Sequence, residues 1–349
     1  MANWAGLPQD VLELIARRLA IEDYLSFGRV CTSWRSAAAA AKEAYKAKSK
    51  APWLMTHVGE RKAEFFSPSG GRIFQLLASR VQTMSPSGWL LVSNGDRDSL
   101  FNPLSGIRIE LPTLEKRRHK SGLTAELGLE RLQWDSPGIK INKIALSSSP
   151  SLSRSYTVMS YSFSSGFAFH KSGEDAWTVV SRPTHLPRFH VHQLIYYNGL
   201  FVALDACNRI MTLNERKCRM QLRLVLREDL CGCPYLVECS SSLLVAWTTW
   251  NGESITNIRV SKVDLENRTH QEVKSLGNAS LFLNAHSSSS FSVEFDAESC
   301  LPGIKPNHIY FMDLDDEKKS YNMDDGKVET FNYAISRDNY AVGWLQPDF

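Results

Sequence analysis

The chain has 349 residues, of which 43% are hydrophobic and 22% are charged. This balance is typical of folded globular proteins and excludes a largely disordered chain, and the length predicts more than one domain core. The formal net charge of +3 is small for such a length. It gives no reason to expect a nucleic acid or an anionic membrane as a partner.

The first 20 residues are not expected to form an export signal, because Asp10 and Glu13 interrupt their apolar stretch and the start lacks basic residues. No apolar run approaches the ~20 residues of a membrane-spanning helix, so no membrane contact is expected. The seven cysteines are an odd and scattered set, which does not predict a disulfide framework. We therefore expect the protein in the cytoplasm, the nucleus or both.

Residues 7–48 have the period of helices. Pro8 suits a first helical position and Asp10 a first turn, and Thr32 or Ser33 is suited to begin a further helix that contains an alanine run. The sequence predicts a three-helix module over residues 1–48. Its apolar residues recur at spacings of three and four and form two stripes, Leu12, Ile15 and Leu19, and then Phe27, Val30, Cys31 and Trp34.

After Lys50 the pattern changes to short strands separated by turn residues. Residues 107–111 and 139–144 alternate apolar and polar side chains, as in a strand with one solvent-exposed face. Asn198-Gly199 predicts a hairpin with a type I′ turn, and Asp325-Gly326 repeats that signal. About twenty short strands in ~300 residues indicate a β-propeller, kelch-like, with five to seven blades over residues 49–349.

An exposed insertion is expected at residues 112–136, which contain the basic run Arg117-Arg118-His119-Lys120. The run is typical of a solvated surface loop and equally of a nuclear import signal. A serine-rich connector is expected at residues 147–155.

The N-terminal residues resemble the F-box pattern over roughly residues 4–44. The rest of the chain resembles a plant family of F-box proteins with a KIB-type propeller. The F-box resemblance rests on Leu7-Pro8, Asp10, Leu12, Ile15, Leu19, Asp23, Leu25, Phe27, Val30-Cys31 and Trp34-Arg35. The second resemblance rests on Ala51-Pro52-Trp53-Leu54-Met55, Ser87-Gly88-Trp89-Leu90, Phe101-Asn102-Pro103-Leu104-Ser105-Gly106, Leu111-Pro112, Asp175-Ala176-Trp177, Lys274-Ser275-Leu276-Gly277, Leu281-Phe282-Leu283 and His308-Ile309-Tyr310-Phe311.

The resemblance implies that the F-box binds a Skp-type adaptor and, through it, a cullin. A module of ~45 residues buries little surface alone, so external support agrees with its size. The alternative is that the same apolar side chains only form the module's own core, and Leu12, Leu19 and Phe27 are expected mainly there. The residues predicted to bind the adaptor are Leu7, Pro8, Leu12, Ile15, Val30, Cys31 and Trp34.

No pattern in the chain predicts a catalytic, cofactor-binding or metal site. Cys231, Cys233 and Cys239 lack a second Cys pair, and the histidines at 185, 190 and 192 do not have zinc spacing. The aspartates near 313–325 lack the glycine and glutamate positions of a calcium loop. Phosphate-binding and nucleophile motifs are absent from the sequence.

These observations favour a non-enzymatic substrate receptor of a Skp–cullin–F-box ubiquitin ligase, whose propeller binds an unidentified target protein for ubiquitination and proteasomal degradation. Trp250, Tyr196 and Tyr197 are candidate target contacts, although a buried blade position suits each of them better. Two alternatives stay open. One is an adaptor-binding protein that acts outside a cullin ligase, and the other is a propeller enzyme with a vestigial F-box.

Overall fold

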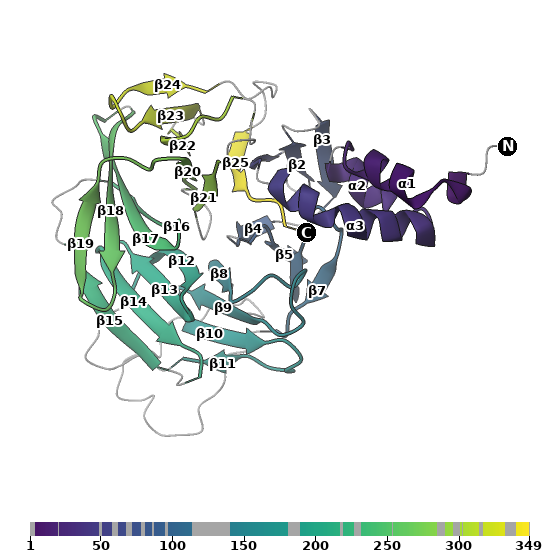
Figure 1. The fold of residues 1–349 in the computed structure, drawn as a ribbon. Helices are drawn as coiled ribbons and strands as arrows, with labels where there is room; N and C mark the ends of the chain where they lie inside the picture. The colour runs from purple at the N-terminus through teal and green to yellow at the C-terminus, as the bar shows by residue number, and fades with distance from the viewer. Residues whose placement is uncertain are drawn as a thin grey trace.

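The computed structural model is a helical module attached to a ring of β-sheets (Figure 1). It describes residues 4–348 with the exception of residues 20, 49–50, 58–61, 68–71, 78–80, 86, 95–96, 114–139, 181–188, 217–218, 227–231, 253, 285–289, 296–300, 302, 314–316 and 332–339. The expected insertion with its basic run, and also His185 and Cys231, therefore lie wholly or almost wholly outside the described residues.

The helical module consists of a 3-10 turn, η1 (Trp4–Gly6), and the helices α1 (Gln9–Ala16), α2 (Ile21–Phe27) and α3 (Thr32–Lys48). Pro8 precedes α1 as its N-cap residue, with φ −56° and ψ 145°, so its predicted place inside the first turn is wrong by one residue. Asp10 lies in the first turn as predicted, where a carboxylate is stabilised by the helix dipole. Helix α3 contacts both α1 and α2.

The strands of the described residues form six sheets, which are the blades of a six-bladed propeller. The number lies within the predicted range of five to seven. Blade A contains β25 (Tyr340–Leu345), β1 (Trp53–His57), β2 (Lys62–Ser67) and β3 (Arg72–Leu77), blade B contains β4 (Val81–Met84), β5 (Leu90–Asn94), β6 (Arg97–Phe101) and β7 (Arg108–Glu110), and blade C contains β8 (Lys143–Leu146), β9 (Thr157–Ser162), β10 (Gly166–Lys171) and β11 (Thr178–Val179).

The second half of the ring repeats this plan with one exception. In blade F the first strand, β20, pairs in parallel with β22, and β21 adds a fifth strand on the inner side. Blade D contains β12 (Val191–Tyr197), β13 (Leu200–Asp205), β14 (Arg209–Asn214) and β15 (Arg219–Val225), blade E contains β16 (Pro234–Cys239), β17 (Ser242–Trp250), β18 (Ile255–Asp264) and β19 (Thr269–Val273), and blade F contains β20 (Ala279–Phe282), β21 (Phe291–Glu294), β22 (His308–Met312), β23 (Lys318–Asn322) and β24 (Val328–Thr330).

The ring is closed by strands from the two ends of the propeller. Strand β25 pairs with β1 in antiparallel fashion, so that Trp53 lies opposite Leu345 and Leu54 opposite Trp344. The innermost strands of neighbouring blades contact one another, as β8 does β12, β12 does β16 and β16 does β21. Where such an inner strand is covered on both sides, consecutive residues are buried and apolar, as Tyr235, Leu236 and Val237 are in β16.

The two turn signals had different outcomes. Asn198 and Gly199 connect β12 to β13 with φ of 46° and 78°, which confirms the type I′ turn. Asp325-Gly326 also lies in a hairpin, between β23 and β24, but only Gly326 has a positive φ. The amide of Gly326 donates to the carbonyl of Asn322 at 2.9 Å, so this turn is wider than the predicted one.

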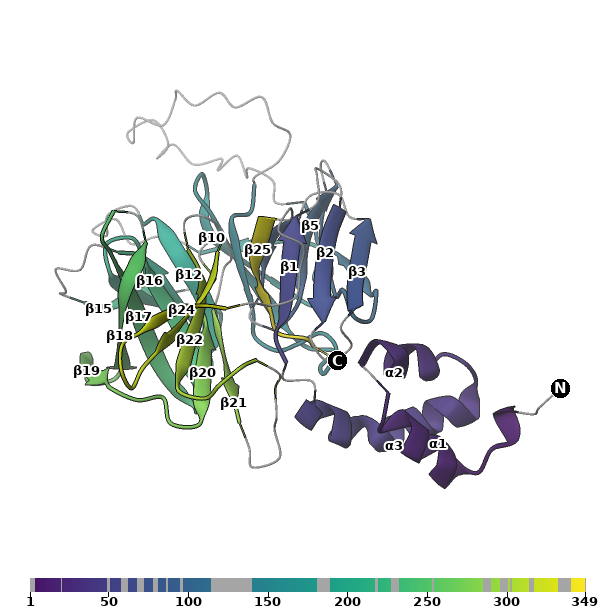
Figure 2. The same cartoon turned by 90° about the horizontal axis from the view of Figure 1, so that it is seen from above.

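The helical module lies against the first two blades. Buried side chains of the helices and of blades A and B form one continuous apolar cluster, and the Arg29 Nη2 atom donates to the carbonyl of Ser105 at 2.6 Å. Ser105 lies in the turn between β6 and β7. Strand β1 begins on the same face of the ring, which we call the helix-side face (Figure 2).

We expect a fragment that begins near Lys50 to fold without the helices, because the other five core clusters of the ring contain only propeller residues. It should give a β-dominated circular dichroism spectrum and one cooperative melting transition. Its melting temperature should be lower than that of the whole chain, since the helix-covered side of blades A and B becomes exposed. A random-coil spectrum from several neighbouring start points would contradict an autonomous propeller.

The segment that follows β25 is bound to blade B. The Asp348 carboxylate accepts hydrogen bonds from Trp89 Nε1 at 2.7 Å and from the Ser149 hydroxyl, and Asn102 Nδ2 donates to its carbonyl at 3.1 Å. The segment approaches Gly88 so closely that a Cβ atom there would lie 2.1 Å from the carbonyl oxygen of Gln346. Gly88, with φ of 74°, is therefore required both by its backbone conformation and by the space available.

Replacing Asp348 by alanine should lower the free energy of unfolding by about 1–3 kcal/mol, because the buried Trp89 indole loses its carboxylate acceptor. Asp348→Asn retains a carbonyl acceptor and should lose less. Urea unfolding of both variants measures the effect. An unchanged midpoint for Asp348→Ala would show that the hydrogen bonds of the Asp348 carboxylate contribute nothing to stability.

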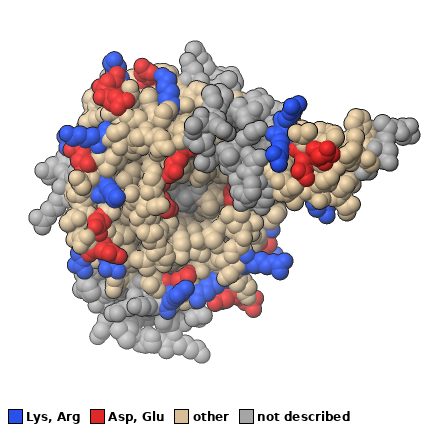
Figure 3. All heavy atoms as spheres, in the orientation of Figure 1, with Lys and Arg blue, Asp and Glu red and all other residues tan. Residues whose placement is uncertain are grey.

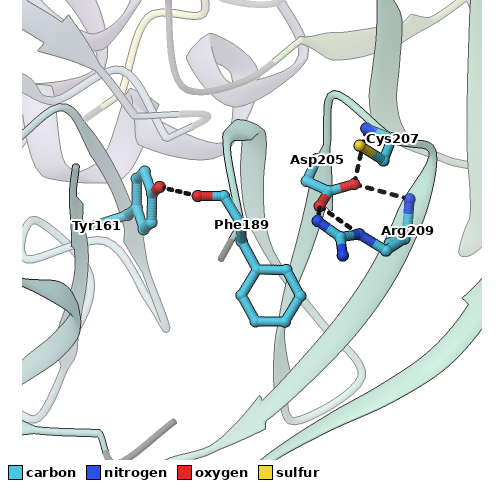
Figure 4. Close-up of polar contacts among 5 residues, drawn as sticks. All are labelled: Tyr161, Phe189, Asp205, Cys207 and Arg209. Atoms are coloured by element: carbon cyan, nitrogen blue, oxygen red, sulfur yellow. Dashed lines mark hydrogen bonds and ion pairs between the residues drawn. The ribbon is translucent and has the colours of Figure 1, made fainter. Parts of the chain in front are cut away.

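A second group of polar contacts lies at the turn between β13 and β14, on the face of the ring opposite the helix-side face (Figure 4). The buried Asp205 accepts hydrogen bonds from the amides of Cys207 and Arg209 at 3.0 and 2.9 Å, and its second oxygen binds the Arg209 guanidinium at 2.7 Å from Nε. The Arg209 guanidinium also lies 4.8 Å from the ring centroid of Phe189. The Tyr161 hydroxyl donates to the Phe189 carbonyl at 2.5 Å and holds that segment in place.

Candidate functional site

The outer surface of the helical module carries exposed apolar side chains. Val30, between α2 and α3, is 60% exposed, and Pro8 is exposed as well. Leu7, Ile15 and Trp34 are half-buried and pack against the apolar cluster beneath them. A surface of this kind is rare on a soluble monomer and is typical of a protein-binding face.

Leu12 does not belong to this surface. Its side chain is 0% exposed and lies in the core of the module with Ala16 and Phe27. Its prediction as an adaptor-binding residue is corrected, because a side chain that faces α3 cannot contact a partner without unfolding α1. Phe27 is buried and Leu19 is partly buried, in agreement with the expected core positions.

Trp34 and Cys31 are held in place by their neighbours. The Trp34 ring packs on Phe27 with centroids 4.4 Å apart, and its Nε1 atom donates to the carbonyl of Trp4 at 3.1 Å. The Cys31 thiol lies 3.1 Å from the Ser33 hydroxyl. This hydrogen bond, followed by one with the backbone of Trp34, lowers the pKa of the Cys31 thiol. Because Trp34 packs on Phe27 yet is only half-buried, one side of its ring is structural and the other is exposed.

Three further apolar residues of the helical module are exposed, and none of them was predicted to bind the adaptor. Leu14 is 58% exposed, Val11 is 37% exposed and Trp4 is 63% exposed. Val11 and Leu14 are three residues apart on α1, so they lie on one face of the helix. The sequence shows the three-residue spacing of Val11 and Leu14, but Leu12 and Ile15 have the same spacing. The helical period alone therefore could not show which of the two pairs is exposed.

The three candidate aromatic residues of the propeller occupy different environments. Trp250 is 37% exposed, and its Nε1 atom donates to the Thr248 hydroxyl at 3.3 Å. Tyr197 is half-buried and its hydroxyl donates to the carbonyl of Ser241 at 3.0 Å, which is a structural role. Tyr196 lines a pocket at the end of the central channel.

Among the described residues considered for metal chemistry, the rings of His190 and His192 lie close together, with centroids 5.7 Å apart. Cys239 is buried, and burial raises the pKa of its thiol and that of Cys233. Asp313 forms an ion pair with Lys319 at 2.5 Å. Among the described residues, no three His, Cys, Asp or Glu side chains are grouped so that they hold a metal ion.

No helix in the described part of the chain is both long and apolar enough to cross a membrane.

Sequence comparison assigns both parts of the chain. The F-box domain model matches residues 4–41, and the KIB1-4 beta-propeller model matches residues 60–332. Because the second match covers most of the chain, the protein belongs to the KIB1-4 beta-propeller family, and it carries an F-box.

Its relatives in Arabidopsis thaliana are F-box proteins. The probable F-box protein At1g65740 is 25% identical over 388 residues, which cover 100% of both chains. The F-box/kelch-repeat protein At3g18720 is 23% identical over 98% of this chain and 85% of its own length. Among solved structures, the β-propeller domain of Myceliophteria thermophila Cps50 (Swd1) covers 83% of this chain and 85% of its own, at 11% identity and a TM-score of 0.43.

Proposed function

We propose that the protein is the substrate receptor of a Skp–cullin–F-box ubiquitin ligase. In this role the F-box binds a Skp-type adaptor, the propeller binds a target protein, and the target is ubiquitinated and degraded by the proteasome. The observation that carries the proposal is that apolar side chains, Pro8, Leu14 and Val30, are exposed on a module that matches the F-box domain. An isolated chain gains nothing from exposing these side chains to water.

The proposal assigns no catalysis to this chain. The thioester that donates ubiquitin belongs to a separate conjugating enzyme, and the receptor contributes proximity by holding a target lysine near it. The contact between Arg29 and Ser105 and the shared apolar cluster support this role, because they fix the propeller relative to the F-box. A kelch-like relationship of the blades and a location in the cytoplasm, the nucleus or both are parts of the same proposal.

The test is affinity capture of the tagged protein from its native cells with the proteasome inhibited. Wild-type protein should recover the adaptor, a cullin and a target, whereas a folded variant of the F-box surface should recover the target alone. Recovery of the adaptor without a cullin would favour an interaction protein outside the ligase. Recovery of neither by the wild type would contradict the proposal.

A further inference from the structure

A pocket of about 350 Å³ opens at the end of the central channel on the helix-side face. It is formed where the inner strands of three blades end, with Tyr196 from β12, Glu238 from β16, Glu294 from β21 and Gln346 directly after β25. Figure 3 looks onto this face, and acidic atoms border the central hollow near the place where Figure 1 labels β16 and β21.

The floor of the pocket is rigid because a buried polar network joins three inner strands. Gln193 Nε2 donates to the carbonyl of Asn284 at 3.3 Å, and the amide of Ser290 donates to Gln193 Oε1 at 3.2 Å. Asn284 exchanges two hydrogen bonds with the backbone of Trp344, at 2.9 and 2.7 Å. Gln193, Asn284 and Ser290 are each at most 2% exposed, so the network is buried and shielded from solvent.

The wall of the pocket is rich in oxygen atoms and carries negative charge. Among the described residues that line it are four serines and two glutamates, and none is Lys, Arg or His. Glu294 accepts a hydrogen bond from the amide of Ser240 at 3.0 Å, which fixes its carboxylate at the rim. The backbone carbonyl of Glu238 accepts from the Ser292 hydroxyl at 2.7 Å, but its carboxylate has no hydrogen-bond or ionic partner among the described residues.

Partial burial raises the pKa of the Glu238 carboxyl. The raised pKa means that the ionised form of Glu238 is destabilised in the free protein, because desolvation disfavours charge. A cation placed in the pocket would reverse this shift, because an opposite charge nearby favours the ionised form. The two carboxylates, with no basic side chain among the described lining residues, give the pocket the electrostatic preference of a site for a positive group.

The lining of the pocket favours one kind of occupant over two others. An apolar ligand does not match a wall of serine hydroxyls and carboxylates. A metal ion needs several converging ligands, and no described group of three His, Cys, Asp or Glu residues provides them. A lysine or arginine side chain has a long stem and a charged end with several donors, which match the two carboxylates and the serine hydroxyls of the wall.

We propose that this pocket binds a lysine or arginine side chain of the target protein, with Glu238 and Glu294 pairing with its charged end. The inference rests on the proposed function, because it presumes a protein target. The pocket lies on the face at which β1 enters from the F-box, since Gln346 follows the residue paired with Trp53. A target held there is on the same side of the ring as the adaptor.

The test uses the full chain bound to a Skp-type adaptor and a phage-displayed library of random 12-residue peptides. Selection on the wild type should enrich lysine or arginine at one position, and the recovered residue shows which of the two the pocket prefers. Glu238→Gln/Glu294→Gln should not give this enrichment. The best peptide should bind the double variant about tenfold more weakly, an effect between those of a surface and a buried charge pair.

The matched control is Glu266→Gln/Glu272→Gln, which removes two exposed glutamates from the outer part of the same propeller, in blade E. This control should bind the peptide like the wild type. Replacing the basic residue of the peptide by glutamine should cost about tenfold with the wild type and little with the pocket variant, because the two changes remove one interaction.

Several results would overturn the inference. They are a selection without enrichment of basic residues, equal enrichment on the pocket variant, and a pocket occupied by Ca²⁺ in a calorimetric titration with the metal alone. Measuring adaptor binding distinguishes a failure of this inference from a failure of the proposed function. If wild type and pocket variant both bind the adaptor, only the pocket inference is wrong, and if the wild type does not bind it, the receptor function is wrong.

Discussion

Replacing Asp205 by alanine is expected to lower the free energy of unfolding by about 3–5 kcal/mol, the usual cost of breaking a buried ion pair from one side. The Asp205 side chain is 0% exposed and that of Arg209 is 14% exposed, with Nη2 and Oδ2 2.5 Å apart. The substitution also removes the acceptor of two backbone amides in the turn. Denaturant unfolding with a constant slope would measure the loss.

Asp264→Ala is the matched control for this result. Asp264 accepts hydrogen bonds from the amides of Glu266 and Asn267, both at 2.9 Å, in the turn between β18 and β19. It therefore also accepts two backbone amides in a turn, from the second and third residues after it rather than the second and fourth, in a solvated position without a buried arginine. The control should lose clearly less stability than Asp205→Ala. Equal losses would mean that the turn geometry, and not the buried ion pair, provides the stabilisation.

Asp205→Asn separates the contribution of the negative charge from that of the turn hydrogen bonds. The amide side chain retains an oxygen acceptor for the turn but removes the negative charge beside the Arg209 guanidinium. Its loss should lie between those of the alanine variant and the control. A loss as small as that of the control would indicate that the guanidinium is stabilised mainly by the Phe189 ring, which it also contacts.

Local features of the fold could be predicted from the sequence because their causes are local. The hairpin at Asn198-Gly199 needs two residues with positive φ, and such residues are recognisable in a sequence. A helix start near Thr32 was predicted from the capping preference of hydroxyl side chains, but α3 already includes Thr32, so its N-cap position is Cys31. The alternation at residues 139–144 was misleading, since the strand of that region is Lys143–Leu146.

Closure of the ring could not be predicted in the same way. The pairing of Trp53 with Leu345 joins residues almost 300 positions apart, and no local pattern of either strand names its partner. The parallel pairing of β20 and β22 likewise depends on a strand inserted between them in the sequence. The pocket at the channel end is built from short segments of separate blades, so no single motif marks it.

The surface proposed to bind the adaptor was predictable in part. The F-box pattern places Val30, Pro8 and Leu7 correctly near the surface, but it cannot separate them from Leu12, since core and interface share the helical period. Exposure depends on where α3 packs against α1, which is a tertiary property. The structure therefore changes which substitutions are the best probes of adaptor binding.

Replacing Val30 by glutamate is expected to weaken binding of a Skp-type adaptor by about a hundredfold, because a charge would enter the apolar centre of the interface without a partner. Val30 is 60% exposed in the free protein, so the substitution should leave the fold intact. The prediction is checked by measuring the affinity of purified adaptor for the full chain, with a melting curve for each variant.

Val225→Glu is the control, since Val225 is also an exposed valine, at 46%, but lies on β15 in blade D. It should bind the adaptor with wild-type affinity. The double variant Leu7→Ala/Pro8→Ala tests the other side of the same surface and should lose about thirtyfold, or ~2 kcal/mol. Trp34→Ala is a less specific probe, because the Trp34 ring also packs on Phe27. If folded Val30→Glu and Leu7→Ala/Pro8→Ala both retain wild-type affinity, the adaptor binds elsewhere on the chain and the assignment of this surface is wrong.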